Sequence, residues 1–135
     1  MSVKLLSTEI VAYSDLDLSF TPNPLTGDLT PLTNVAAVRR SVVNLVNMDA
    51  FDIPFDFGAG SSIKKMLFEP ATELTAAALN TRIEFLIAKY EPRAVLQSVD
   101  TTVGTGGIGF NVTVRILVRA TAQIETFTFY VSRVR

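Results

Sequence analysis

The side chains that could do acid–base chemistry in this chain are carboxylates, because the sequence contains neither histidine nor cysteine. That composition removes the commonest general base, thiolate chemistry, disulfides and the usual metal ligands. Glycoside hydrolysis would need two carboxylates about 5 to 10 Å apart. Eight scattered acidic residues could supply such a pair: Asp15, Asp17, Asp52, Asp56, Glu69, Glu73, Glu84 and Glu91. Nothing in their spacing gives two of them distinct environments, so helix caps, turns and surface charges are favoured. We expect no catalytic, cofactor-binding or metal-binding residues.

Two glycine-rich stretches could hold phosphate groups. The segment "GTGGIG" places Gly104, Gly106 and Gly109 at the spacing of a dinucleotide-binding loop, but that loop opens a helix. A strongly alternating strand pattern follows here, which predicts a hairpin. Residues 58–62 could receive an anion at a helix start. They lack the lysine-serine ending of a phosphate loop, so a capped turn is favoured.

A third candidate is the corner Glu91-Pro92-Arg93, which lies between a helical pattern and a strand pattern. Proline lacks an N–H and disfavours helical dihedrals in the residue before it, so the corner could simply end a helix. Alternatively, the rigid bend could present Glu91 and Arg93 to a partner. The local sequence leaves both interpretations open.

Composition limits the class of protein. The chain has 135 residues, 48% hydrophobic and 19% charged, which predicts one domain with a substantial core. A net charge of −1 gives no footprint for nucleic acid or an anionic membrane surface. The sequence shows neither a membrane-spanning apolar run nor a secretory signal pattern, so we expect a cytoplasmic protein that contacts no nucleic acid and no membrane.

Hydrophobic periodicity predicts the first elements. Leu16, Leu18 and Phe20 alternate with polar residues, which is the period of a half-buried strand. Four proline and glycine positions then predict a loop over residues 21–34. Helical spacing follows over residues 34–48, with Thr33 or Asn34 as the cap.

Two further helices are predicted before the corner. Ser61 or Ser62 could cap a short helix that ends near Phe68, and Thr75 could cap a longer one that ends at Tyr90. Four phenylalanines lie in this part of the chain, and we interpret them as core or interface residues, with the core favoured. They are Phe51, Phe55, Phe57 and Phe68.

The rest of the chain predicts strands. We predict a three-stranded antiparallel meander from three successive stretches: "AVLQSVDTTV", the alternating "FNVTVRILVRA" and the threonine-rich, aromatic "IETFTFYVSRVR". The predicted fold class is α+β, with helices packed on a small, mainly antiparallel sheet. Its last strand has an uncharged stretch, "TFTFYVS", along a potentially open edge.

Three stretches resemble one family in this order: "YSDLDLSF" at residues 13–20, "FGAGSSIKKMLFEP" at 57–70 and "YEPRAVLQSV" at 90–99. Together they are similar to the sheath-initiator subunit of contractile-tail baseplate wedges, a family historically labelled tail lysozyme and related to type VI secretion baseplate subunits. The resemblance covers about residues 10–100. It implies a single domain over residues 1–135 that is a non-enzymatic structural subunit.

The resemblance also implies partners and a location. In the family the Glu-Pro-Arg corner contacts the helical bundle that joins the wedge subunits, and the end strands engage arms of the first sheath ring. Carried over, Glu91, Pro92 and Arg93 would bind other wedge proteins in a virion tail baseplate, present in multiple copies and assembled in the host cytoplasm. We expect the corner to be exposed, so that reversing either charge leaves the fold largely intact.

The tail sheath protein is the second expected partner. We expect it to add a strand to the C-terminal meander over residues 109–133, at positions that include Thr126, Thr128 and Tyr130. Two alternatives from other classes remain: a peptidoglycan-cleaving tail lysozyme and a cytoplasmic adaptor of the same fold. A structure with an open sheet edge would favour assembly, whereas two carboxylates facing a groove would favour hydrolysis.

Overall fold

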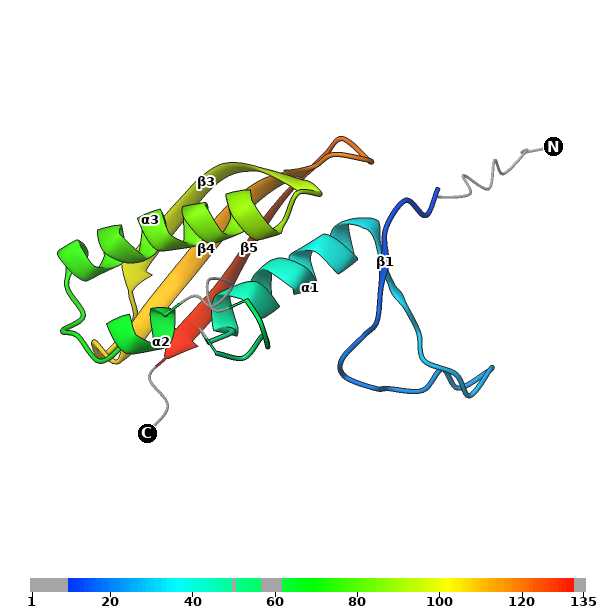
Figure 1. Ribbon diagram of the computed structural model, residues 1–135, viewed down its shortest axis with the longest axis horizontal. Coiled ribbons are helices and arrows are strands. Elements are labelled where there is room, and N and C mark those ends of the chain that lie inside the picture. Colours follow the sequence, from blue (N-terminus) through cyan, green and yellow to red (C-terminus); the bar gives the residue numbers. More distant parts are fainter. Residues whose placement is uncertain (1–9, 50, 57–61, 133–135) are drawn as a thin grey trace.

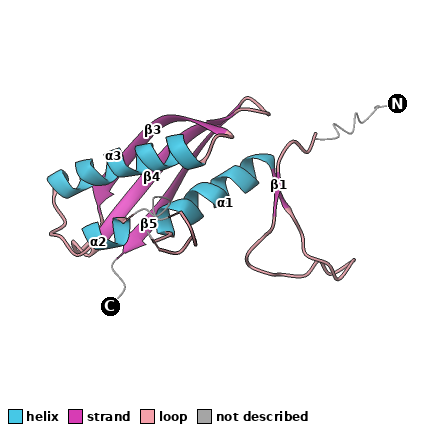
Figure 2. Ribbon diagram, in the orientation of Figure 1, coloured by secondary structure: helices cyan, strands magenta, loops and turns pink. Residues whose placement is uncertain are grey.

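The computed structural model describes residues 10–49, 51–56 and 62–132. In chain order the elements are β1 (Ser14–Asp15), β2 (Leu32–Thr33), α1 (Asn34–Asn47), α2 (Ile63–Met66), α3 (Glu73–Tyr90), β3 (Ala94–Val103), β4 (Gly109–Val118) and β5 (Gln123–Ser132). The α+β prediction is confirmed, because the helices pack on one face of an antiparallel sheet (Figure 1; Figure 2). No helix within the described ranges has the length and apolar character needed to cross a membrane.

The predicted C-terminal meander is confirmed, with strand order β3-β4-β5 and both pairings antiparallel. The glycine-rich stretch is the β3–β4 turn, where the Gly104 N–H donates to the Gly109 carbonyl at 2.8 Å. Gly106 and Gly107 have φ values of +85° and +68°, in the region that glycine adopts without steric cost. A hairpin therefore stands where the glycine spacing superficially matched a dinucleotide loop.

The core lies between this sheet and the two long helices. Side chains alternate in direction along β4, and those of its even-numbered residues point toward the helices, as the strand pattern predicts. The apolar stripes of α1 and α3 meet them from the other side. The largest fully buried side chains are Phe110, Ile63, Leu79, Ile83, Leu86, Ile87, Ile116, Val38, Val42, Val46, Val112 and Val114.

The helix boundaries match the predictions closely, with differences at their starts. Thr72, not Thr75, caps α3, and its side chain accepts the Thr75 N–H at 3.3 Å. The Thr75 hydroxyl instead donates to the Pro70 carbonyl at 2.8 Å. Ser62 precedes α2 with φ +50° and makes no side-chain capping bond. Ser61 and most of the segment 58–62 lie outside the described residues.

Two predictions about apolar residues are wrong. Residues 16–20 form no strand but an irregular segment with a turn, and Leu16, Leu18 and Phe20 are exposed. Their alternation matched a strand pattern, but these residues lie after β1 in a segment that projects away from the main sheet, so they pair with none of its strands. The favoured core interpretation is also wrong for Phe51, Phe55 and Phe68, which are exposed because they come from connecting segments that run over the surface; the interface interpretation stays a prediction. Phe57 lies outside the described residues.

The described chain before α1, residues 10–33, is here called the arm. Its two short strands pair with each other, Ser14 with Thr33 and Asp15 with Leu32, and Pro22 bridges to Leu29 further out. Figure 1 shows the arm as a blue loop that extends away from the packed helices and sheet. Residues 21–31 of the predicted loop are thus the outer part of this projecting element, whereas Leu32 and Thr33 form β2 and Asn34 begins α1.

Candidate functional site

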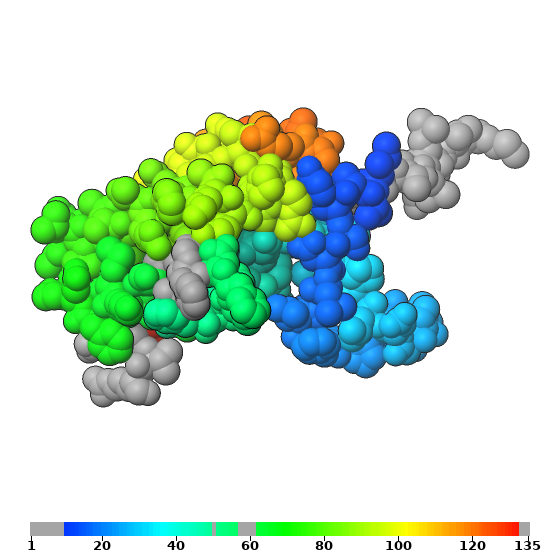
Figure 3. Space-filling view, viewed as in Figure 1, coloured from blue at the N-terminus to red at the C-terminus, as the bar shows by residue number. Residues whose placement is uncertain are grey.

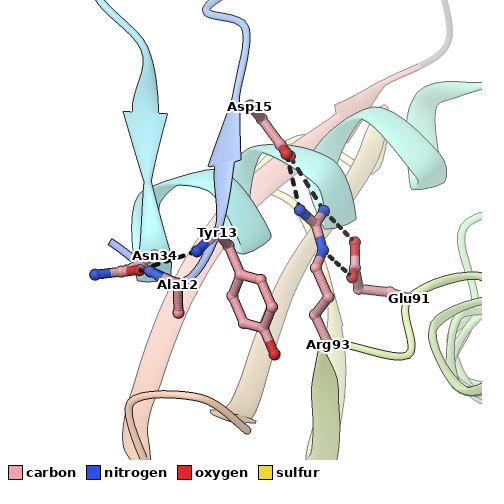
Figure 4. A network of polar contacts seen from close by, with 6 residues as sticks. All are labelled: Ala12, Tyr13, Asp15, Asn34, Glu91 and Arg93. Atoms are coloured by element: carbon pink, nitrogen blue, oxygen red, sulfur yellow. Dashed lines mark hydrogen bonds and ion pairs between the residues drawn. The ribbon is translucent and has the colours of Figure 1, made fainter. Parts of the chain in front are cut away.

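The Glu91-Pro92-Arg93 corner is the centre of a charge network. The Arg93 guanidinium donates through Nε and Nη2 to both oxygens of Glu91, at 2.7 and 2.9 Å. It also donates through Nη1 and Nη2 to both oxygens of Asp15 in β1, at 2.8 and 3.1 Å. Figure 4 shows the two carboxylates on either side of the guanidinium. One arginine therefore holds two carboxylates in bidentate geometry and ties the arm to the start of β3.

The expected exposure of this corner is wrong for Glu91. Its side chain is 2% exposed, and that of Arg93 is 24% exposed. The corner also ends α3: the Glu91 N–H donates to the Ile87 carbonyl, and the helix stops at Tyr90 before Pro92. Hydrogen bonds to Glu91 and then Asp15 raise the pKa of Arg93, so it stays charged at any working pH. The corner therefore ends the helix and also holds an internal charge network, and its contact with a partner stays a prediction.

Asn34 is a residue of this network that sequence reasoning assigned only as a possible cap. It is buried, has φ +47°, and points its side chain back at the arm. Its Oδ1 accepts the N–H groups of Ala12 and Tyr13 at 2.9 and 3.2 Å, and its Nδ2 donates to the Ile10 carbonyl at 2.9 Å. Asparagine tolerates the left-handed region better than most residues. The sequence signal that could have indicated this role is an asparagine that follows a threonine at a predicted helix start.

A second ion pair holds the arm further along. Asp17 accepts Arg40 Nη2 at 3.2 Å. The backbone N–H and hydroxyl of Ser19 also donate to Asp17, at 3.0 and 2.8 Å. These bonds from Ser19, with a smaller contribution from Arg40, lower the pKa of Asp17 below its ordinary 3.8. In the described part of the chain no group of three or more acidic residues is placed to share a metal ion.

The second candidate site is the outer edge of β5. Within the described residues, β4 is its only hydrogen-bonded neighbour. Backbone hydrogen bonds join Gly104 to Gly109 and Arg93 to Arg119. The backbone groups of the odd-numbered residues along β4 therefore bond to β3. The backbone N–H and C=O groups of the even-numbered residues of β4 therefore point toward β5, because these groups alternate in direction along a strand.

The register converts this alternation into an orientation for β5. Asn111, Thr113 and Arg115 stand opposite Tyr130, Thr128 and Thr126. These are non-hydrogen-bonded pairs, so the N–H and C=O groups of the three β5 residues point away from β4. The three positions predicted for strand addition thus form one outward-facing row of backbone donors and acceptors. Their binding role stays a prediction.

A groove borders this edge. It has a volume of about 700 Å³, and its lining comes from β2, α1 and β5, with none from β4: Leu32, Thr33, Val35, Ala36, Arg39, Arg40, Val43, Glu125 and Phe129. Arg39 stands 3.9 Å from Glu125 and 5.5 Å from the centre of the Phe127 ring. We call it the edge groove. A chain laid beside β5 would find apolar side chains and two arginines next to the backbone row.

Tyr130 differs from the two threonines because its ring has a structural contact. A Cβ added to Gly109 would stand 2.7 Å from the Tyr130 hydroxyl, and one added to Gly104 would stand 2.8 Å from Tyr130 Cε2. The ring therefore lies against glycine backbone at the β3–β4 turn. A substitution of Tyr130 disturbs that turn as well as the edge.

The structure does not bring the two sets of predicted site residues together. The corner precedes β3, one outer strand of the sheet, whereas Thr126, Thr128 and Tyr130 lie on β5, the other outer strand. Among the scattered carboxylates, Asp15 and Glu91 do come close, but with Arg93 between them. The geometry thus offers two surfaces, one at the arm and one at the edge, which adjoin at Leu32 and Thr33 of β2 in the lining of the edge groove.

Comparison with known proteins identifies the fold. No family model matches the chain, and no curated protein matches it. Among solved structures, a protein of Geobacter sulfurreducens provisionally assigned as a tail lysozyme aligns with a TM-score of 0.65 and 14% identity, over 73% of this chain and 89% of that one.

Two further neighbours come from baseplates. A chain of the anti-feeding prophage baseplate aligns with a TM-score of 0.61 and 19% identity, over 91% of this chain and 87% of that one. A chain of the postcontraction pyocin R2 baseplate aligns with a TM-score of 0.55 and 16% identity, over 90% of this chain and its own full length. The family resemblance that the sequence shows is thereby confirmed at the level of the fold.

Proposed function

We propose that this chain is a structural subunit of a contractile-tail baseplate, which joins the wedge and initiates tail sheath polymerisation by strand addition. The fold that it shares with chains of two baseplates supports the baseplate role. The observation that carries the sheath role is the outward row of backbone groups on β5 beside the edge groove. An edge of this kind is a template for another chain's strand.

Strand addition divides the work between backbone and side chains. The outward N–H and C=O groups of Thr126 and Thr128 would bond to the incoming strand and supply affinity. Its alternate side chains would enter the edge groove against Val35, Val43 and Phe129 and set the register. The partner in this proposal is the tail sheath protein.

Proline substitution tests the edge directly. Thr128→Pro removes an outward N–H, and proline is tolerated on edge strands where the N–H faces solvent. We expect a folded monomer that fails to start sheath polymerisation on an otherwise assembled baseplate. Thr128→Val is the matched control, since it keeps the N–H and loses only the hydroxyl contact to Thr113. Sheaths of normal length with folded Thr126→Pro and Thr128→Pro variants would rule out this edge.

The wedge is the second partner in this proposal. Glu91, Pro92 and Arg93 lie with the arm at the end of the molecule where β3 begins, apart from the β5 row. A subunit with these two surfaces could bind wedge proteins and sheath at the same time. Association with purified wedge proteins, measured without sheath protein, tests this half separately.

A hydrolase is the alternative that the name of one neighbour raises. The geometry favours a non-catalytic subunit, because both carboxylate oxygens of Asp15 and of Glu91 already accept hydrogen bonds from Arg93. A general acid would instead need a raised pKa in an apolar site. We expect no clearing of permeabilised cells in a turbidity assay. Clearing that is lost when one Asp or Glu is changed to its amide would overturn the non-catalytic proposal.

A further inference from the structure

The arm keeps large apolar side chains in solvent. Figure 3 shows it as a separate lobe beside the packed body of the molecule. The exposed apolar residues of the arm are Ile10, Val11, Leu16, Leu18, Phe20 and Leu25. Leu25, near the outer end, is 93% exposed. Because a large exposed apolar patch on a soluble protein marks an interaction site, this concentration on one element makes the arm a candidate interaction surface.

Polar anchors fix this arm in place, together with the partly buried Tyr13, which packs against the core. Asn34 holds the backbone at Ile10, Ala12 and Tyr13, while Arg93 and Arg40 hold Asp15 and Asp17. An element ordered in advance loses less entropy when it binds. The network therefore does more than stabilise the core: it gives the apolar residues of the arm a defined direction.

We propose that the arm is the docking element for a neighbouring wedge protein, and that Glu91 and Arg93 are positioning residues that act through Asp15. Of the three acidic residues in the arm, Asp15 and Asp17 are paired with Arg93 and Arg40, which leaves Asp28 near the outer end, and the arm contains no basic residue. The complementary occupant is an apolar groove rimmed by lysine or arginine on the wedge protein. Leu18, Phe20 and Leu25 enter that groove, and Asp28 faces its rim.

This inference rests on the proposed wedge role and changes how the corner serves it. Glu91 is too buried to reach a partner, yet it fixes Arg93, which fixes Asp15. Loss of the corner would then weaken wedge binding because the arm loses its direction. A direct contact of Glu91 is not required.

The experiment compares arm variants for binding to purified wedge proteins, with sheath protein absent. Leu18→Ser and Leu25→Ser should each weaken association at least tenfold without lowering the melting temperature, because both side chains are exposed in the free protein. Leu74→Ser is the matched control, since Leu74 is also an exposed leucine but lies at the start of α3, outside the arm. It should bind as the wild-type chain does.

A second variant tests the positioning step. Asp15→Ala should speed amide hydrogen exchange in residues 10–33 of the isolated protein, leave exchange in β4 unchanged, and weaken wedge association at least tenfold. Normal binding by the Leu18 and Leu25 variants, while the wild-type chain binds, would overturn the docking role and leave the proposed function standing. Unchanged arm exchange in Asp15→Ala would overturn the positioning role. A wild-type chain that binds no wedge protein would overturn the proposed function itself.

Discussion

Arg93 is the residue on which the largest number of contacts in the network depend. It makes four hydrogen bonds to two carboxylates, one of them almost fully buried. A buried carboxylate without its partner retains the cost of lost hydration, so such pairs respond strongly when one member is removed. The corner therefore belongs to the folding of the chain as much as to its proposed binding.

Reversal of the buried charge is expected to destabilise the protein. Glu91→Lys places a lysine beside Arg93, and we expect the free energy of unfolding to fall by roughly 3 to 5 kcal/mol. Glu91→Gln should cost less, because Asp15 still pairs with Arg93. Glu84→Lys, on an exposed position of α3, should change stability by no more than about 0.5 kcal/mol. Urea denaturation of the three variants decides, and equal stabilities would contradict the buried network.

The Asp17 contact gives the arm a pH dependence in acid. Because folding lowers the pKa of Asp17, its stabilising contribution is present above the ordinary value of 3.8 and is lost as the pH falls through the lower, folded value. We expect an NMR titration of the Asp17 carboxyl carbon to have its midpoint below 3.8. Asp17→Asn should remove the stabilisation that the ionised carboxylate gives the arm above that pH. A midpoint at or above 3.8 would mean that the Ser19 bonds do not form in solution.

At the scale of elements, the β3–β4 turn depends on Gly109, because a Cβ atom has no room at that position. A Cβ at Gly109 would stand 2.5 Å from the Val131 carbonyl oxygen. We expect Gly109→Ala to lower the free energy of unfolding by about 1 to 3 kcal/mol, as overpacking does. Gly107→Asn is the control, because Gly107 has open space around it and asparagine tolerates positive φ. Thermal melts that place both variants at the same temperature would contradict this packing.

Sequence periodicity predicted the elements whose apolar residues are buried in register. The stripes of α1 and α3 and the alternation of β4 all face one core, so local pattern and tertiary packing agree. Pro92 likewise marked the end of α3. The same reasoning failed for residues 16–20, where alternation is present but the segment belongs to the arm, which extends away from the main sheet and its strands. A pattern of period two records what a segment could bury, and not whether a neighbour exists.

The candidate sites were predictable to different degrees. The open edge followed from strand order and from the uncharged stretch in the last strand. The link between Arg93 and Asp15 joins residues 78 apart, and no spacing rule connects such positions. Asn34 was hidden for a similar reason: at a helix start its ordinary role is a cap, and its actual hydrogen bonds run to a segment more than 20 residues earlier.

At the scale of the whole molecule, the two proposed surfaces adjoin one another: the arm contributes Leu32 and Thr33 to the edge groove, and Arg40, which also lines the groove, pairs with Asp17 of the arm. The arm is tied to the corner before β3, and the row of outward backbone groups runs along β5 on the far side of β4. Helix α1 contacts the arm strands β1 and β2 as well as β5, which keeps the two surfaces in a fixed relation. A subunit built in this way can hold a wedge protein with one surface while it offers an edge to the sheath with the other.

Residue-resolved amide hydrogen exchange, with and without sheath protein bound to the baseplate, tests the central claim most directly. In the free protein the amides of Thr126, Thr128 and Tyr130 should exchange quickly, whereas those of Phe127 and Phe129 are already protected by their bonds to β4. Strand addition predicts that sheath protein slows exchange at the three outward amides and leaves the two inward ones unchanged. Outward amides that exchange equally fast in the sheath-bound baseplate would contradict strand addition at β5.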